Sequence, residues 1–180
     1  TNDEFLEVFG SDGERTNILK LRDVIHREGD WHKTFHMHMY CMRGKYPFIF
    51  LQRRHPNKDV GADTLDTLVA GHYRLTDKCS ELAASRECFE EVGINIETSN
   101  LNHVGVRKIR DHADRNIRNY ELQDVFFYKS DLDFQDITLK RDEVVGIYRV
   151  NILGLIELLT GLTSSIPNVD SAVLNGQGQL

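Results

Sequence analysis

Residues 70–94, AGHYRLTDKCSELAASRECFEEVGI, carry the strongest pattern in the chain. When this stretch is drawn as a helix at about 100° per residue, Leu82, Phe89 and Val92 fall on one side. Three glutamates fall together on another side, so one face is apolar and one is acidic. The pattern therefore predicts a helix over about residues 78–92, whose apolar side packs against the rest of the protein.

The acidic side consists of Glu87, Glu90 and Glu91. Like charges three or four residues apart repel by about 0.2–0.5 kcal/mol per pair, and Glu91 also faces the negative end of the helix dipole. A hard divalent cation would turn this repulsion into ligation, because Mg²⁺ prefers carboxylate oxygens. The alternative is an acidic face that is simply solvated.

The spacing of these residues resembles a known motif. Gly71, followed by the string RECFEEVGI that begins at Arg86, is similar to the Nudix box, G-x5-E-x7-R-E-U-x-E-E-x-G-U, in which U is a bulky apolar residue. The second half matches closely, with Cys88 as the weaker apolar residue. The first half is one residue longer than the pattern, and Asp77 stands near the place of its glutamate. We therefore expect Nudix chemistry with an altered loop before the helix.

The resemblance implies an α/β fold, a Nudix-type α/β/α sandwich with a mixed β-sheet, and a hydrolase acting on phosphorus-containing acid anhydrides. It also implies roles for the matched positions. Arg86 would orient a helix carboxylate or pair with Asp77, and Gly71 would shape the loop before the helix. Glu87 would be either a further metal ligand or the general base. The implied metal ligands are Glu87, Glu90, Glu91 and the backbone carbonyl of Ala70.

Length and composition fit a single Nudix domain over residues 1–180. The chain is 40% hydrophobic and 28% charged, which suffices for a substantial core. Its net charge of −6 provides no basic footprint, so neither nucleic acid nor an anionic membrane is expected as a partner. No signal-peptide pattern and no apolar run near the roughly eighteen residues of a membrane span is present. Cys41, Cys79 and Cys88 lack C-x-x-C spacing and fit reduced thiols in the cytoplasm.

Alternating and turn-bounded patterns predict the strands. In residues 34–41, phenylalanine, methionine and cysteine alternate with histidine and tyrosine, as in a strand with two unlike faces. The polar stretch DHADRNIRN at 111–119 is expected to connect two strands. Residues 1–14 are expected as an N-terminal strand and turn, and 162–180 as a mobile tail or late surface element. The expected strands are 5–9, 34–41, 47–54, 64–70, 103–110, 120–128 and 145–150, with a closing helix at 151–161.

Residues outside the box resemble one branch of the Nudix family in particular, the branch related to isopentenyl diphosphate isomerase. The isomerase has a cysteine just before its Gly-His pair, and here that position is Ala70. An allylic isomerase needs a proton donor and acceptor, and it also tends to lose box glutamates, whereas this chain keeps all three. Both departures point to hydrolysis. The residues that carry this likeness are His26, His32, His36, Gln52, Arg53, Arg54, Lys58 and the run Ala70-Gly71-His72.

The same likeness implies a second candidate metal site. Comparable histidines of the isomerase bind a metal together with two glutamates. The matching residues here are His26, His32, His72 and Glu121, while the other glutamate falls at Asn119. Three imidazoles and one carboxylate can bind Zn²⁺ or Mn²⁺. Because one ligand is missing, hydrogen-bonded structural histidines are the preferred interpretation.

Two further groups of residues have candidate roles. Glu121 lies beyond the box on an expected strand, where many Nudix hydrolases place a carboxylate that completes the metal site or acts as the base. Glu121 and Glu87 are thus the two candidates for the catalytic base. Arg53, Arg54 and Lys58 form a basic cluster that can hold a substrate phosphate beside the acidic site. The alternative is ordinary solvated surface.

Together these observations predict a Mg²⁺-dependent hydrolase, with Mn²⁺ as the other suitable ion, that cleaves a diphosphate linkage in a small molecule. A nucleoside diphosphate derivative is the expected substrate. Two alternatives stay open: an enzyme like isopentenyl diphosphate isomerase, and a Nudix-fold module that binds a ligand without catalysis. Retention of every helix glutamate counts against the non-catalytic module.

Overall fold

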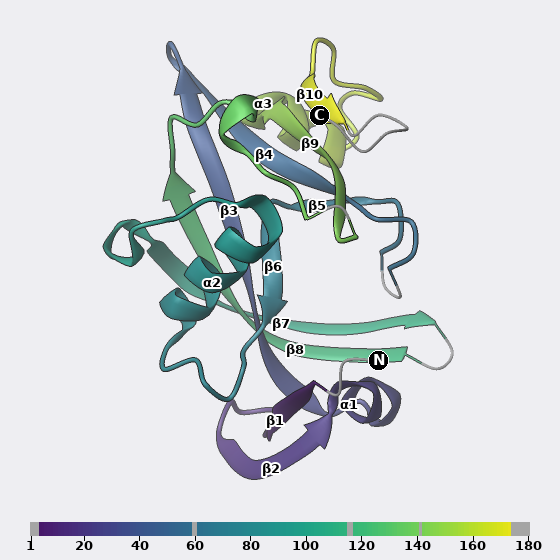
Figure 1. The fold of residues 1–180 in the computed structure, drawn as a ribbon. Helices are drawn as coiled ribbons and strands as arrows, with labels where there is room; N and C mark the ends of the chain where they lie inside the picture. Colours follow the sequence, from purple (N-terminus) through teal and green to yellow (C-terminus); the bar gives the residue numbers. More distant parts are fainter. Residues whose placement is uncertain (1–3, 59–60, 115–116, 141, 174–180) are drawn as a thin grey trace.

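The structure is a computed structural model that describes residues 4–58, 61–114, 117–140 and 142–173. Within these ranges it contains a ten-stranded mixed sheet and three α-helices (Figure 1). The strands are β1 (Phe5–Phe9), β2 (Arg15–Leu21), β3 (Trp31–Arg43), β4 (Tyr46–Arg54), β5 (Leu65–Thr67), β6 (Val69–His72), β7 (Asn102–Asp114), β8 (Ile117–Lys129), β9 (Val144–Asn151) and β10 (Asp170–Val173). The helices are α1 (Arg22–Glu28), α2 (Ser80–Val92) and α3 (Ile152–Leu159), with 3₁₀ turns at Thr98–Asn100 and Phe134–Asp136.

The sheet is organised around β3, the strand predicted to have two unlike faces. It runs parallel to β8 from Trp31 to Tyr40 and antiparallel to β1, β4 and β6. The sheet is therefore mixed, as predicted. One face of β3 is fully buried, which follows from the alternation of its side chains. The residues on that face are Phe35, Met37, Met39 and Cys41.

The main core lies between this face of β3 and α2. In Figure 1, α2 lies across one side of the sheet, next to β3 and β6. Because successive strand residues point to opposite faces, the histidines of β3 lie on the other side, away from the core. Core members from several elements include Phe35, Phe50, Leu68, Ala84, Cys88, Phe126 and Ile147.

The packing side of α2 differs from the predicted one. Leu82 and Phe89 are 45% and 55% exposed, and of the predicted apolar side only Val92 is buried. Small residues let a helix axis approach a sheet closely, and here the contact is made by Ala83, Ala84, Cys88 and Val92. The helix is therefore rotated relative to the prediction, and the side that contacts the sheet adjoins the glutamates.

α1 is a short helix that the sequence pattern did not predict. It spans seven residues between β2 and β3, with Ile25 fully buried and Gly29 ending the helix at a φ of 77°. Two helical turns are too few for an amphipathic period to stand out. This helix carries His26 to the end of β3 where His32 lies.

The hairpin of β7 and β8 corrects the connection expected at residues 111–119. The first four of these residues belong to β7 and the last three to β8, with Asp111 opposite Asn119. Antiparallel pairing satisfies the backbone whatever the side chains are, so polarity alone did not reveal these strand ends. Residues 115–116 lie outside the described part of the chain.

The predictions for the two ends of the chain have different outcomes. Residues 5–9 form β1, as predicted. Within the segment expected to be a mobile tail, Asp170–Val173 form β10 and pair antiparallel with β9, so these four residues are held in the sheet. Residues 174–180 lie outside the described part. No helix among the described residues is long and apolar enough to span a bilayer.

Candidate active site

The box begins where β6 passes under α2. Ala70 pairs with His36 of β3, and Gly71 pairs with Phe35. A Cβ atom on Gly71 would lie 3.0 Å from Cγ and 3.1 Å from Cδ of Glu87. These separations are shorter than most carbon–carbon contacts in proteins, so a glycine at 71 is what lets the Glu87 side chain lie directly over the strand.

Arg86 joins the longer box loop to the helix. Its guanidinium donates to both oxygens of Asp77, at 3.2 and 2.8 Å. It also donates to Glu87 at 2.5 Å and to Glu90 at 3.4 Å, and lies 3.4 Å from the backbone oxygen of His72. Burial acts to raise the pKa of Asp77, but the Arg86 hydrogen bond and a backbone N–H hold it below its ordinary value. The inserted residue thus leaves Asp77 within reach of Arg86, and Arg86 makes both contacts that the resemblance allowed.

The repulsion between the helix glutamates is offset by arginines. Arg74 donates to both oxygens of Glu90, at 3.0 and 2.7 Å, a bidentate geometry. Burial raises the pKa of Glu87, even though Arg86 acts to lower it. The acidic cluster, defined here as Glu87, Glu90 and Glu91, is therefore partly compensated by cationic side chains.

Glu91 differs from its two neighbours. Its Oε2 atom is buried and has no hydrogen-bond partner. Burial raises the pKa of Glu91 to about 8, with the charges of Glu87 and Glu143 acting in the same direction, whereas Lys58 and Arg54 act in the opposite direction. A buried acceptor without a donor is costly, and a divalent cation would satisfy it. The unpartnered oxygen of Glu91 is therefore the feature of the acidic cluster that fits a divalent cation.

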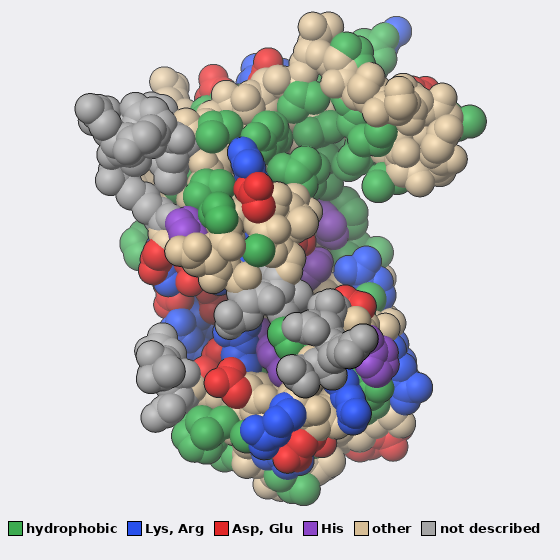
Figure 2. Space-filling model, turned by 90° about the vertical axis from the view of Figure 1, so that its right-hand side faces the viewer, with side chains coloured by type: hydrophobic (Ala, Val, Ile, Leu, Met, Phe, Trp, Pro, Cys, Tyr) green, Lys and Arg blue, Asp and Glu red, His purple; other side chains and the backbone are tan. Residues whose placement is uncertain are grey.

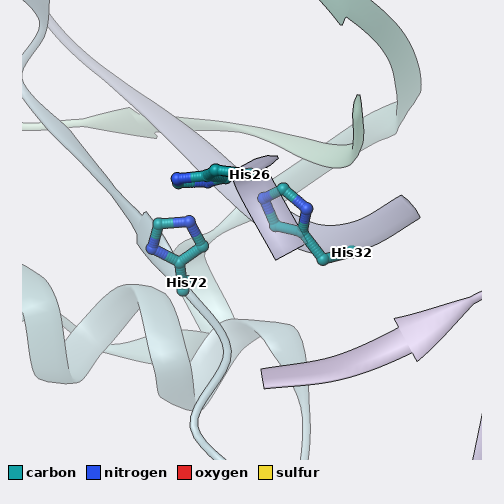
Figure 3. A group of neighbouring side chains, drawn as sticks. All are labelled: His26, His32 and His72. Carbon is teal, nitrogen blue, oxygen red and sulfur yellow. The ribbon is translucent and has the colours of Figure 1, made fainter. Parts of the chain in front are cut away.

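Three histidines converge from separate elements. His26 comes from α1, His32 from β3 and His72 from β6, and their rings face one another in Figure 3. Ring nitrogens of all three lie within 4.8 Å of one another. Two nitrogens bound to one tetrahedral Zn²⁺ are about 3.3 Å apart, given Zn–N bonds of about 2.0–2.1 Å. Small side-chain shifts would therefore bring this histidine cluster to ligand geometry.

The ring nitrogens of the histidine cluster lack most of the hydrogen-bond partners that buried imidazoles usually have. Nδ1 of His32 lies 3.2 Å from the backbone oxygen of Asp30, which favours a proton on Nδ1 and leaves Nε2 as an acceptor. The Nε2 atoms of His26, His32 and His72 are all buried without a partner. Burial lowers the pKa of His26 to about 4, and it also lowers the pKa values of the other two. Neutral imidazoles are the form that binds metals.

Glu121 lies beside the histidine cluster. It pairs with His32 in the register of β3 and β8. Its carboxylate accepts hydrogen bonds from Thr34 at 3.1 Å, Asn119 at 2.7 Å and Gln123 at 2.9 Å. The other amide atom of Asn119, Oδ1, is buried without a partner. Glu121 therefore lies next to His32 in the sheet and is hydrogen-bonded to Asn119.

The predicted basic cluster is not a single surface. Arg53 and Arg54 are consecutive in β4, so their side chains leave opposite faces of the strand. Each of the three cations also has a carboxylate partner, which the sequence did not reveal. The positive charges of Lys58 and Arg54 nevertheless act to lower the pKa of Glu91. The ion pairs are Arg53 with Asp63 at 2.8 Å, Arg54 with Asp66 at 3.2 Å, and Lys58 with Glu143.

The chain closely resembles a protein of Clostridium acetobutylicum, described as an uncharacterised Nudix hydrolase. The two are 32% identical over 179 residues, which cover 98% of this chain and 84% of that protein. The chain belongs to the Nudix hydrolase family. A second Nudix relative, Nudix hydrolase 3 of Arabidopsis thaliana, is 28% identical over 149 residues, but these make up only 19% of that protein. A scan against models of protein families found no match.

Solved structures show the same fold. A Deinococcus radiodurans protein superimposes with a TM-score of 0.65 at 17% identity, covering 88% of this chain and 90% of that one. The Nudix domain of Shewanella oneidensis NrtR, solved with ADP-ribose, gives a TM-score of 0.54 at 10% identity, covering 69% and 75%. The predicted Nudix fold is confirmed, and with it a hydrolase class that acts on phosphorus-containing acid anhydrides.

Two residues near the site of this Nudix hydrolase were missed by sequence reasoning. Arg74 forms an ion pair with Glu90. It is the only arginine between Gly71 and α2, so the sequence could have identified it as the partner of a box glutamate. Glu143 lies in the mixed-charge run KRDE at 140–143, which carries no pattern. Figure 2 shows histidine side chains gathered across the middle of one face, with Lys and Arg side chains beside them. Imidazole and cationic side chains therefore share this face.

Proposed function

We propose that this Nudix hydrolase cleaves a diphosphate linkage in a nucleoside diphosphate derivative, using Mg²⁺ or Mn²⁺ bound at the acidic cluster. The observation that carries the proposal is the buried, unpartnered Oε2 of Glu91 at the end of α2. Burying a carboxylate without a partner is costly. A side of α2 that served only to pack against the sheet would therefore not carry three carboxylates. The cation, when bound, would neutralise phosphate oxygens and lower the pKa of an attacking water.

The protein groups around the cluster then have distinct tasks. Glu90 and Glu91 would hold the cation, and the backbone carbonyl of Ala70, in the strand that Glu87 contacts at Gly71, would be the further ligand. Arg86 fixes the Glu87 carboxylate against β6. Glu87 accepts the proton of water, because its raised pKa brings it nearer to the working pH of a general base. Glu121, the other base candidate, is engaged by three donors beside the histidine cluster.

The proposed substrate class rests on charge and on likeness of fold. The nearby cations Lys58 and Arg54 can receive phosphate oxygens once their carboxylate partners are displaced. The similar Nudix domain of NrtR was solved with ADP-ribose, a nucleoside diphosphate derivative. An isomerase is disfavoured because Ala70 has no proton to give where the isomerase has a cysteine.

The histidine cluster supports a second metal site. Sequence reasoning favoured structural histidines, but hydrogen-bonded structural histidines would have partners, and three Nε2 atoms here have none. We propose that His26, His32 and His72, with Glu121 alongside, bind Zn²⁺ or Mn²⁺. Asn119 would contribute its free Oδ1 in place of the missing carboxylate.

A substrate panel tests the proposed reaction. Purified protein is incubated with ADP-ribose, other nucleoside diphosphate derivatives and isopentenyl diphosphate, with Mg²⁺ or Mn²⁺. We expect metal-dependent release of nucleoside monophosphate, and a loss of at least about a hundredfold in kcat for Glu91→Gln. Glu97→Gln, the same change at an exposed position just past the helix, is the control and should keep full activity. Absence of metal-dependent cleavage across the panel, or conversion of isopentenyl diphosphate, would contradict the proposal.

A further inference from the structure

A chain of hydrogen bonds crosses the sheet on the side that carries the histidine cluster. Arg107 of β7 lies opposite Gln123 of β8, and Ile109 lies opposite Glu121. Glu121 in turn lies opposite His32 of β3. Residues paired directly across two strands place their side chains on the same side of the sheet, with Cβ atoms about 5 Å apart. Arg107 therefore lies on the histidine side of the sheet, one strand beyond Gln123 and Glu121.

Arg107 fixes the orientation of the Gln123 amide. Nε and Nη2 of Arg107 both donate to Oε1 of Gln123, Nε at 2.8 Å. A guanidinium has only donors, so the amide must turn its oxygen toward Arg107 and its NH2 group the other way. Nε2 of Gln123 then donates to Oε2 of Glu121 at 2.9 Å. Gln123 is only 2% exposed, so a reversed amide would bury two mismatched groups away from solvent.

The same direction of donation fixes Asn119. Glu121 accepts from Gln123 and Thr34 at Oε2, and from Nδ2 of Asn119 at Oε1 over 2.7 Å. An ionised carboxylate only accepts, so Asn119 must turn its NH2 group toward Glu121 and its oxygen away. That oxygen, Oδ1, is buried without a partner, as are the Nε2 atoms of the histidine cluster. The chain thus begins at a side chain that only donates and ends at an unused acceptor, which indicates a ligand at its inner end.

We propose that Arg107 is a positioning residue for the cation of the histidine cluster, because it sets the orientation of Glu121 and Asn119 through Gln123. The inference rests on the second metal site proposed above. Arg107 does not contact the cation itself. Without its guanidinium the Gln123 amide can reverse, and the amide oxygen would then face Oε2 of Glu121 and repel it. The carboxylate and the oxygen of Asn119 would lose the orientation in which they can serve a cation.

The positive charge of Arg107 leads to the opposite expectation. A guanidinium on the same side of the sheet repels a bound cation. If Arg107 acted through its charge alone, its removal would therefore tighten metal binding. If Arg107 acts by orienting Gln123, its removal should weaken metal binding. The sign of the change in affinity separates the two explanations.

Binding of Co²⁺, a coloured substitute for Zn²⁺, tests the assignment. The full chain is titrated with Co²⁺ while its visible absorbance is recorded, with Mg²⁺ in excess because imidazole sites do not favour Mg²⁺ whereas carboxylate sites do. Arg107→Met should weaken Co²⁺ binding by about tenfold, since losing a partner of a metal ligand typically costs about 10–100-fold in affinity. Arg107→Lys keeps a donor for Oε1 of Gln123 and should recover most of the affinity. Arg110→Met removes an equal charge from the other side of β7 and should bind as the wild type does.

A double variant shows whether the two residues act as one chain. Gln123→Leu removes the amide and should weaken Co²⁺ binding as much as Arg107→Met does, and combining the two should add no further loss. Additive losses would overturn the proposal, as would unchanged or tighter binding in Arg107→Met. Equal losses in Arg107→Met and Arg107→Lys would overturn it too, because the donor to Gln123 would then not matter. Should Gln123→Leu not fold, the variants of Arg107, an exposed residue, decide the question by themselves.

His32→Ala is the reference that distinguishes two failures. Loss of Co²⁺ binding in His32→Ala, with wild-type binding in Arg107→Met, would overturn the role of Arg107 alone. Wild-type binding in His32→Ala would show that the histidine cluster does not hold the cation, and the proposed second metal site would fail with it. Loss of binding in His32→Ala, weaker binding in Arg107→Met and recovery in Arg107→Lys are the expected results.

Discussion

Gly71 lies so close to Glu87 that a side chain at this position would collide with the glutamate. A methyl group on Gly71 would come within 3.0 and 3.1 Å of two carbons of Glu87, so the carboxylate would have to move away from the strand. The close contact with Glu87 explains why the box has a glycine at position 71. This explanation does not depend on the backbone angle φ, since Gly71 is not among the glycines with positive φ. The proposed catalytic carboxylate is thereby placed on the backbone of β6, at the edge of the core.

Glu91 should make the stability of the metal-free protein decrease as the pH rises above the ordinary range of a carboxyl group. Its pKa of about 8 exceeds the ordinary value of 4.5, so between these pH values the folded state holds a proton that the unfolded state has lost. The contribution of Glu91 to stability should therefore be fully present below about pH 4.5 and should be lost as the pH rises to about 8. The loss is on the order of 5 kcal/mol, at about 1.4 kcal/mol for each pH unit.

Glu91→Gln removes this dependence. With a chelator present, we expect the variant to match the wild type in free energy of unfolding at pH 5 and to exceed it at pH 9. Urea unfolding at pH 5, 7 and 9 measures the difference. Glu97→Gln, which changes an exposed glutamate, should follow the wild-type curve. A difference between Glu91→Gln and the wild type that does not vary with pH would contradict the assigned pKa.

At the scale of elements, α2 packs through its small residues and leaves large ones in solvent. Ala83, Ala84 and Cys88 are fully buried, whereas Leu82 and Phe89 are exposed. The close approach that alanine permits also brings Glu87 against β6. A helix packed through Leu82 and Phe89 would lie farther from the strand, and the glutamates would turn toward solvent.

Substitutions on the two sides of α2 should therefore differ in their effect. Phe89→Ser changes an exposed side chain and should alter the free energy of unfolding by no more than about 0.5 kcal/mol. Cys88→Ser places a hydroxyl at a fully buried site and should cost about 1–3 kcal/mol. Urea unfolding of both variants at one pH checks the contrast. Equal losses would mean that the predicted apolar side, rather than the observed one, faces the core.

β8 uses its two faces for different purposes. Glu121 and Gln123 point toward the histidine side of β3 and are hydrogen-bonded to each other at 2.9 Å. Asp124 points the opposite way, where it accepts hydrogen bonds from Tyr73 and, at 2.7 Å, from His103. The buried Asp124 thereby ties β7 and β8 to the residue that follows β6. One strand thus serves the candidate site and the packing of the core at once.

For the whole molecule, the histidine cluster joins β6 to α1 and β3, two consecutive elements that lie about forty residues earlier in the chain. His26, His32 and His72 come from α1, β3 and β6. A metal bound there should stabilise the folded state, because the unfolded chain does not hold the three rings together. At a free concentration of about one hundred times Kd, the gain is about 2.7 kcal/mol.

Thermal unfolding with and without Zn²⁺ checks this expectation. The Tm of the wild type should rise with Zn²⁺ and return when a chelator is added, whereas His32→Ala should show no rise. His112→Ala, which removes an exposed histidine outside the cluster, should respond as the wild type does. A Zn²⁺-induced rise that survives in His32→Ala would place the ion elsewhere.

The sequence by itself predicted the Nudix fold, most of the strands and the helix that carries the box glutamates. The alternation in β3, the helix at 80–92 and the spacing from Gly71 to Glu91 are local patterns, and local patterns arise from the periods of the strand and the helix. Backbone geometry fixes those periods, so they can be recognised in the sequence without knowing which residues contact one another in the fold. α1 was not predicted, because seven residues make too few helical turns for a periodic pattern to be recognised.

Only the tertiary structure decided which groups meet. The rotation of α2 depends on how closely alanine lets it approach the sheet, and the partners of Arg54 and Lys58 depend on loops from elsewhere in the chain. The approach of His72 to His26 and His32, and the backbone contact of Lys140 with Glu91, likewise join residues distant in sequence. Such contacts are set by the balance of packing and desolvation over the whole fold, and no local period encodes that balance.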